Sequence, residues 1–122
     1  MRVLDETAVL DRDQLRDIAL DDRDLMQELL SALLDDTARQ LRLMDVAIRE
    51  HDPKLTMRLA HSCKGACANI GANAIAATLK RMEQQAAREA FEECAATLAA
   101  LDFELDRLRQ VIQPRMHTNT HE

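Results

Sequence analysis

The sequence predicts an all-α fold, an antiparallel up-down-up-down four-helix bundle with a short extra helix at its N-terminal end. Hydrophobic residues make up 47% of the chain but aromatic residues only 2%, whereas sheets favour aromatic and β-branched residues. Apolar residues recur three and four residues apart in long stretches joined by short connections, which favours a helical bundle. The length of 122 residues fits a single domain over 1–122, with a core from about 10 to 113.

The N-terminal third predicts a short helix followed by a long one. Asp11 is a plausible N-cap for a helix from Arg12 to Ala19, with Leu15 and Ile18 on its inner side. Asp21 or Asp22 then caps a helix that runs to about Glu50. The core positions expected on this long helix are Met26, Leu30, Leu33, Thr37, Leu41, Met44 and Ile48.

A third helix is expected from Lys54 to Ile70. The sequence His51-Asp52-Pro53 ends the preceding helix, because the residue before proline avoids helical dihedrals and proline suits the first turn of a new helix. Gly71 is placed to form a left-handed C-cap, and Asn73 to cap the next helix. The apolar side predicted for this third helix consists of Leu55, Leu59, Cys63, Ala66 and Ile70.

Two further helices complete the predicted bundle. One runs from Ala74 to about Arg88, and the other starts close to Glu89-Ala90-Phe91, where no glycine or proline marks the boundary. Pro114 should end the last helix, and residues 114–122 are expected to form a flexible tail. The expected core positions are Ile75, Leu79, Met82 and Ala86, and then Phe91, Cys94, Leu98, Leu101, Leu105, Leu108 and Ile112.

Charge and composition exclude several classes of function. The net charge of -6 and the pI near 5.2 argue against a nucleic-acid binder, which needs a basic face. No apolar run approaches the length of a membrane span, and the N-terminus lacks the apolar segment of a signal peptide, so we expect a cytoplasmic protein. The three cysteines, Cys63, Cys67 and Cys94, are then expected to be reduced thiols in the core.

The segment from Ala60 to Ala72 stands out because small residues surround one histidine and one lysine. On a helical wheel His61 falls opposite the predicted apolar side, so its imidazole should face solvent. A neutral imidazole is a good nucleophile toward phosphorus at physiological pH. The neighbours expected beside it on the outer surface are Met57, Lys64, Gly65 and Ala68.

The pattern His61-x-x-Lys64-Gly65, followed by Asn69-Ile70-Gly71-Ala72, resembles the histidine-containing phosphotransfer (HPt) domains of bacterial phosphorelays. The resemblance runs roughly from Leu10 to Ile112. It implies that His61 is the phosphoacceptor, that Lys64 is the cation beside the phosphoryl group, and that Gly65 leaves the gap through which a partner approaches. The sequence departs from the family at Cys63 and Cys67, where an aliphatic and a small residue are more common.

Folding about the predicted turns brings two more residues level with His61. If the helices pair as antiparallel hairpins, Glu83 lies opposite His61 and could accept a hydrogen bond from one ring nitrogen, although an ordinary solvated glutamate fits equally well. On the long helix Leu43 lies at the same level and off the core stripe. Together with Met57 and Ala68 it would form a small apolar rim suited to docking another protein.

A metal site in this segment is not expected. Cys63 and Cys67 turn inward, whereas His61 points about 160° away from Cys63, so one ion cannot take all three as ligands. Position 58 is Arg58, which excludes the Glu-x-x-His pair of di-iron bundles. Gly65 and Gly71 do not form a nucleotide-binding motif, so no cofactor of its own is expected.

The resemblance implies a freestanding phosphotransfer protein and not an ATP-dependent kinase. His61 would accept a phosphoryl group from the aspartate of one receiver domain and pass it to another, in a hybrid sensor kinase and a response regulator. The receiver domain would supply Mg²⁺. We expect a monomer with no membrane or nucleic-acid partner. The alternative is a helical adaptor or interaction protein in which His61 is incidental.

Overall fold

The computed structural model describes residues 9–112, and these residues form helices joined by short connections, with no strand among them, which confirms the predicted all-α class. The helices are α2 (Arg12–Ile18), α3 (Arg23–Arg49), α4 (Pro53–Ile70), α5 (Asn73–Ala87) and α6 (Phe91–Ile112). The predicted stop at Pro114 and the predicted tail 114–122 lie outside the described residues, as does the side chain of Ile112.

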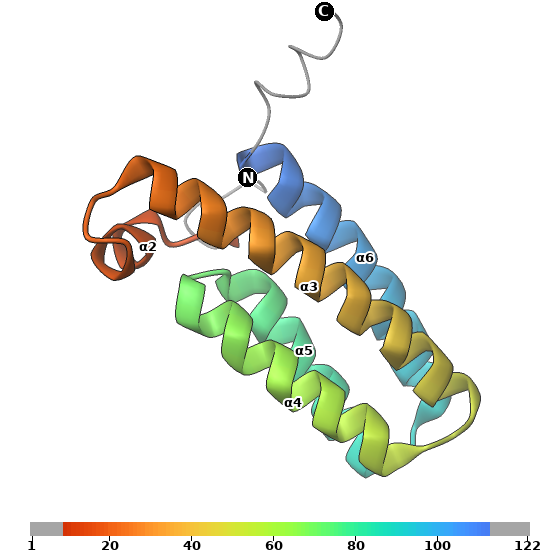
Figure 1. Ribbon diagram of the computed structural model, residues 1–122. Coiled ribbons are helices and arrows are strands. Elements are labelled where there is room, and N and C mark those ends of the chain that lie inside the picture. Colours follow the sequence, from red (N-terminus) through yellow and green to blue (C-terminus); the bar gives the residue numbers. More distant parts are fainter. Residues whose placement is uncertain (1–8, 113–122) are drawn as a thin grey trace, which may run out of the picture.

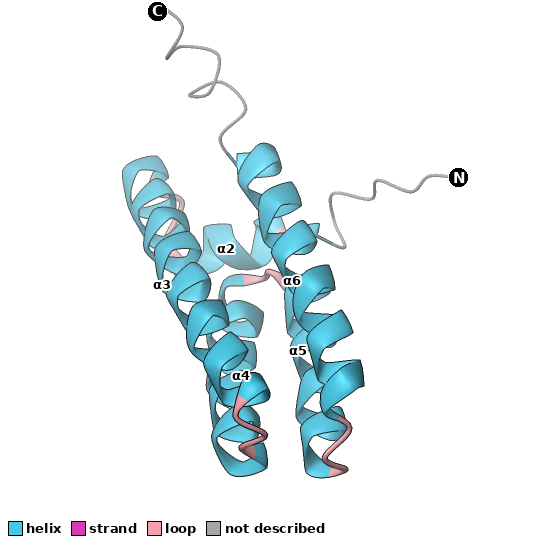
Figure 2. Ribbon diagram, turned by 90° about the vertical axis from the view of Figure 1, so that its right-hand side faces the viewer, coloured by secondary structure: helices cyan, strands magenta, loops and turns pink. Residues whose placement is uncertain are grey.

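The four long helices form a helical bundle around one core (Figure 1). Each packs against two of the others: α3 and α5 both contact α4 and α6. The short helix α2 packs against α4, and Figure 2 shows it crossing the bundle near one end. In the part of the chain that the structure describes, no helix is long and apolar enough to cross a membrane.

Aspartate caps explain where three of the helices begin. The carboxylates of Asp11, Asp22 and Asp52 each accept a hydrogen bond from the backbone N–H three residues further on. Of the two caps expected for α3, Asp22 is the one used. Pro53 occupies the first turn of α4, where its missing N–H costs nothing. The acidic caps therefore set the starting points of α2, α3 and α4.

The turn between α4 and α5 differs in part from its prediction. Gly71 has φ 97° and forms the expected left-handed C-cap of α4. A Cβ at this position would lie 2.8 Å from the backbone oxygen of Asp11, so the turn requires glycine for space as well. The predicted N-cap Asn73 is wrong: Ala72 holds the cap position without a side-chain hydrogen bond. Because the helix starts one residue early, Asn73 is already helical and exposed.

The core confirms the predicted positions of α3 and α5, apart from the half-buried Met26. Leu34 and Ala47 widen the buried stripe of α3. On α6 the predicted positions from Cys94 to Leu108 are buried and Phe91 is half-buried. Ile18 is a wrong prediction, because it is 40% exposed near the end of α2.

The inner face of α4 is rotated from the predicted one. Ala66 is exposed, and Leu55, Leu59 and Ile70 are only half-buried at the edges of the interface. The residues that are buried are small, which lets the backbones of neighbouring helices approach closely. They are Thr56, Ala60, Cys63 and Cys67.

Candidate functional site

His61 lies on the outer side of α4 with its side chain 68% exposed, as its position on the helical wheel predicted. It opens into a shallow depression whose walls belong to α4 and to the start of α2. The residues that line this depression are Gln14, His61, Ser62, Gly65, Ala66, Ala68 and Asn69. Most of these residues have small side chains, so few side-chain atoms project around the imidazole.

Gly65 has no structural neighbour that requires glycine. A Cβ built at this position meets nothing within 4 Å, and its φ is not in the left-handed region. A glycine inside a helix costs up to about 1 kcal/mol relative to alanine. The space above Gly65 therefore lies open beside His61.

Glu83 of α5 contacts two polar side chains of α4, those of His61 and Lys64. Its Oε2 lies 3.0 Å from Nδ1 of His61, and its Oε1 accepts a hydrogen bond of 3.0 Å from Nζ of Lys64. The contact predicted between positions 61 and 83 is therefore present. The additional ion pair to Lys64 was not predicted, because the sequence places Lys64 near His61 without saying which way its flexible stem turns.

Two opposing effects set the charge state of Glu83. Burial raises the pKa of its carboxyl, but the hydrogen bonds from Lys64 and His61 favour the ionised form and outweigh it, so the pKa lies below its ordinary value. The carboxylate is therefore ionised at neutral pH and accepts hydrogen bonds only. It follows that Nδ1 of His61 carries the proton in this bond, which leaves Nε2 unprotonated in the neutral ring.

Gln14 is a part of the site that the sequence analysis missed. Its side-chain amide donates to the backbone oxygens of Ala68, at 2.7 Å, and Asn69, at 3.1 Å, two carbonyls at the C-terminal end of α4. The backbone N–H of Asp11 also donates to the carbonyl of Gly71 at 2.7 Å. These bonds fix α2 against the end of α4 and so build one wall of the depression. No local pattern links residues that are 54 positions apart.

The predicted docking rim is only partly assembled. Ala68 lines the depression beside His61. Leu43 is 43% exposed on α3, as predicted, but is not among the residues that line the depression. Met57 is half-buried and packs against the hydrophobic core, contrary to its predicted place on the outer surface. Its long side chain reaches the core from the edge of the helix, whereas the wheel considers only the direction of Cβ.

The cysteines lie in the core, as predicted, away from the exposed imidazole. All three are free thiols and buried. The hydrogen bond with Cys67 and burial both raise the pKa of the Cys63 thiol, so this sulfur is a poor nucleophile at neutral pH. Within residues 9–112, no group of three or more histidine, cysteine or acidic side chains is placed to hold a metal ion.

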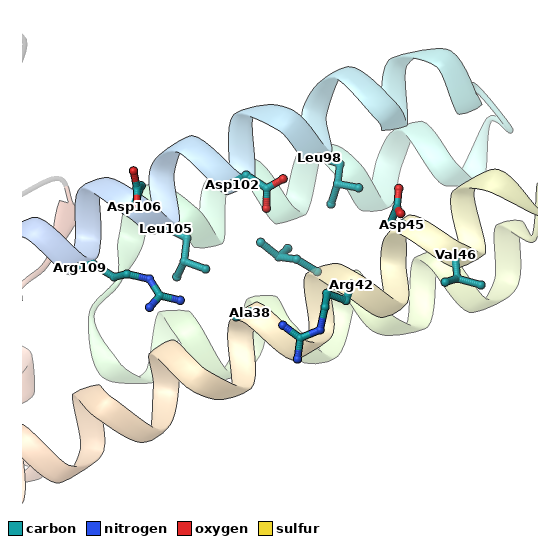
Figure 3. Close-up of a pocket in the computed structure, with 10 residues that line it drawn as sticks. Ala38, Arg42, Asp45, Val46, Leu98, Asp102, Leu105, Asp106 and Arg109 are labelled. Carbon is teal, nitrogen blue, oxygen red and sulfur yellow. The ribbon is translucent and has the colours of Figure 1, made fainter.

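A second hollow lies between α3 and α6 (Figure 3). Its floor is apolar, with Leu41, Leu98 and Leu105, and its edges carry arginines and aspartates of both helices. The side chains that line it include no histidine, cysteine or hydroxyl group. The depression at His61 is therefore the better candidate for group-transfer chemistry.

The fold and the site together define a class of protein. It is a helical bundle with an exposed histidine on one helix, hydrogen-bonded to a carboxylate of the next helix. The model of the Hpt domain family matches residues 28–111, and the chain belongs to this family. The match includes His61, Lys64, Gly65 and Glu83.

Two solved structures share the fold. Histidine-containing phosphotransfer protein B (HptB) from Pseudomonas aeruginosa PAO1 is 24% identical, with a TM-score of 0.80 over 90% of this chain and 96% of that one. A putative histidine-containing phosphotransfer protein from rice is 18% identical, with a TM-score of 0.82 over 96% of this chain and 88% of that one. No curated protein matches the chain.

Proposed function

We propose that this chain is a freestanding phosphotransfer protein in which His61 accepts a phosphoryl group from the aspartate of one receiver domain and passes it to another. The observation that carries the proposal is the state of the ring: Nδ1 is bound to Glu83, and the exposed side chain keeps Nε2 accessible to a partner. Membership of the Hpt family supports the same reaction.

Each residue of the site has a distinct role in phosphoryl transfer. Nε2 of His61 attacks phosphorus with its lone pair, and the aspartate of the receiver departs as a carboxylate. Gly65 and Ala68 leave room for that aspartate and its surroundings. Lys64 offsets the charge of the transferring group when its flexible stem turns from Glu83 toward it. The receiver supplies Mg²⁺, so this chain needs no cofactor and has no kinase activity of its own.

The proposal extends to the organisation of the chain. The four long helices run up-down-up-down as an antiparallel bundle with α2 as the extra helix, and residues 1–122 form a single HPt domain with a core at about 10–113. Connections of two or three residues between the long helices support this topology, because they join neighbouring helices directly. We further propose that the protein is a cytoplasmic monomer whose partners are receiver domains of a hybrid sensor kinase and of a response regulator.

The test is transfer from a receiver domain that has been phosphorylated with acetyl phosphate. A panel of receiver domains is incubated with the protein, and acid-labile, alkali-stable phosphate is measured on the chain. His61→Gln should abolish this phosphate without loss of helix content. His51→Gln is the matched control, since His51 is also exposed but stacks on Phe91 with ring centroids 4.7 Å apart. Labelling that survives His61→Gln, or no labelling from any receiver, contradicts the proposal and favours the adaptor alternative.

A further inference from the structure

Among the helices of residues 9–112, only α4 and α5 carry a net positive charge, and they lie side by side (Figure 1). With histidine counted as neutral, α4 contains three basic residues and no acidic one, and α5 contains two basic residues and one acidic, so together they carry +4. α3 has four basic and five acidic residues, α6 has two and five, and α2 has two of each. Because the whole chain carries -6, His61 lies on the basic side of an acidic protein.

Three of these basic side chains are exposed on the same side as His61. Lys54 and Arg58 precede His61 by seven and three residues, spacings that place all three on one stripe of α4. Since an α-helix rises 1.5 Å per residue, Arg58 lies about 4.5 Å and Lys54 about 10 Å from His61 along the axis. On α5, Lys80 lies one turn before Glu83, which is hydrogen-bonded to His61. We call Lys54, Arg58 and Lys80 the cationic flank.

No carboxylate of the described residues neutralises the cationic flank. None of its three side chains forms an ion pair within residues 9–112. Arginines elsewhere on the surface do so: Arg49 pairs with Asp45 at 3.1 Å, and Arg88 with Glu93 at 2.8 Å. The positive potential of the flank is therefore not cancelled locally. It reaches into solvent over roughly the Debye length, which is about 10 Å at 0.1 M salt.

The partner that the proposed function requires has the opposite charge where it approaches His61. The phosphoaspartate of a receiver domain carries a phosphoryl group with up to about two negative charges. Mg²⁺ beside it is held by carboxylates and phosphate oxygens, whose combined negative charge exceeds the charge of the ion. Complementary potentials of this kind raise association rates by about 10-fold to 1,000-fold.

We propose that the cationic flank steers the anionic face of a receiver domain toward His61, so that the partner this surface fits is a receiver with an acidic rim around its phosphoaspartate. This inference rests on the proposed function and deepens it. The flank acts on the encounter of the two proteins and not on the bond that forms at Nε2. It therefore raises the rate of association and leaves the rate of transfer within the complex unchanged.

The experiment uses the phosphorylated receiver domain that labels the parent chain fastest, and follows transfer over a range of receiver concentrations. The initial slope gives the second-order rate constant, and the plateau gives the rate within the complex. At an ionic strength of about 0.01 M, Arg58→Glu should lower the second-order rate constant about tenfold and leave the plateau unchanged. The matched control, Arg42→Glu, makes the same change in net charge at an exposed arginine in the hollow between α3 and α6, and should stay within about twofold of the parent.

Salt and a more distant variant separate steering from a direct effect on the ring. At about 1 M salt the Debye length falls to about 3 Å, so the defect of Arg58→Glu should shrink to less than about twofold. Lys54→Glu lies two turns from His61, too far to contact the imidazole, and should show a smaller defect with the same salt dependence. A defect that persists at about 1 M salt, or parental rates for both variants at low salt, would overturn the inference.

The same measurements distinguish a failure of this inference from a failure of the proposed function. If no receiver domain phosphorylates the parent at His61, the proposed function fails. If the parent is phosphorylated but Arg58→Glu behaves like Arg42→Glu at low salt, steering by the flank is wrong and the function stands. Circular dichroism should show parental helix content in all three variants, because each substituted side chain is exposed.

Discussion

On the inner face of α4 the buried residues are Thr56, Ala60, Cys63 and Cys67; on the outer face the exposed ones next to His61 are Ser62, Gly65, Ala66 and Ala68. Both of these sets consist of small residues, yet for opposite reasons. Inside, small volume lets neighbouring helices approach the backbone closely, so any added atom meets a packed interior. Outside, small volume leaves the imidazole accessible, and an added atom meets solvent. One helix thus needs small side chains for stability and for access at once.

The largest effect should come from enlarging the inner face. Ala60 is fully buried, so Ala60→Leu forces extra methyl groups into a packed interface and should cost about 1–3 kcal/mol of unfolding free energy. The matched change on the outer face, Ala68→Leu, should stay within about 0.5 kcal/mol of the parent. Urea denaturation of both variants measures the difference. Equal losses in the two variants would mean that the faces do not differ as described.

Enlarging the outer face should instead affect phosphoryl transfer. Gly65→Gln places a long side chain beside His61, in the space that an incoming aspartate needs, and should slow transfer on the order of a hundredfold. Gly65→Ala should raise the unfolding free energy by up to about 1 kcal/mol, because alanine favours the helix and meets open space. Transfer rate and melting temperature are measured together for both variants. Parental transfer by Gly65→Gln would show that the depression is not a docking site.

Much of this fold follows from spacing alone, but the two faces of α4 show the limit of that reasoning. Apolar periodicity located the core of α3 and α5 because large residues mark it. On α4 the buried residues are small or polar, so following the apolar residues identified Cys63 correctly but otherwise selected the edges of the interface and placed Ala66 inside. The exposure of His61 was still predicted correctly, because it lies opposite both the predicted and the actual face.

The site was predictable where it depends on one helix or on one hairpin. His61, Lys64 and Gly65 follow from their spacing, and the contact with Glu83 follows from folding the chain about the turn near Ala72. The wall formed by Gln14 depends on where α2 docks, and no local pattern encodes that. The ion pair of Lys64 with Glu83 depends on a side-chain rotamer, which sequence spacing does not determine.

A charge on α3 should have a smaller effect than a side chain beside His61. Leu43 is 43% exposed, so Leu43→Glu loses little core burial and should leave helix content unchanged. If receiver domains dock across this part of α3, binding should weaken roughly threefold to tenfold, the range for one unfavourable contact at an interface rim. Isothermal titration with a receiver domain measures it. A collapse of thermal stability would mean that Leu43 contributes to the core.

The smallest expected effect is the pH dependence that Glu83 adds to stability. Its pKa is lower in the folded chain than its ordinary value, so the carboxylate stabilises the fold above that ordinary value, and this contribution is lost as the pH falls through the folded pKa. Glu83→Gln should therefore be less stable than the parent at pH 7, by less than about 1 kcal/mol for a partly exposed pair, and equally stable in acid. Urea denaturation between pH 7 and acid tests this. A difference that persists in acid would contradict the assigned cause.

The most direct measurement of the central claim is the identity of the phosphorylated atom. The protein is phosphorylated with phosphoramidate, and ¹⁵N-labelled His61 is observed by NMR for coupling between nitrogen and ³¹P. The account predicts coupling at Nε2, with Nδ1 still protonated toward Glu83. Phosphate on Nδ1, or on a residue other than His61, would contradict it.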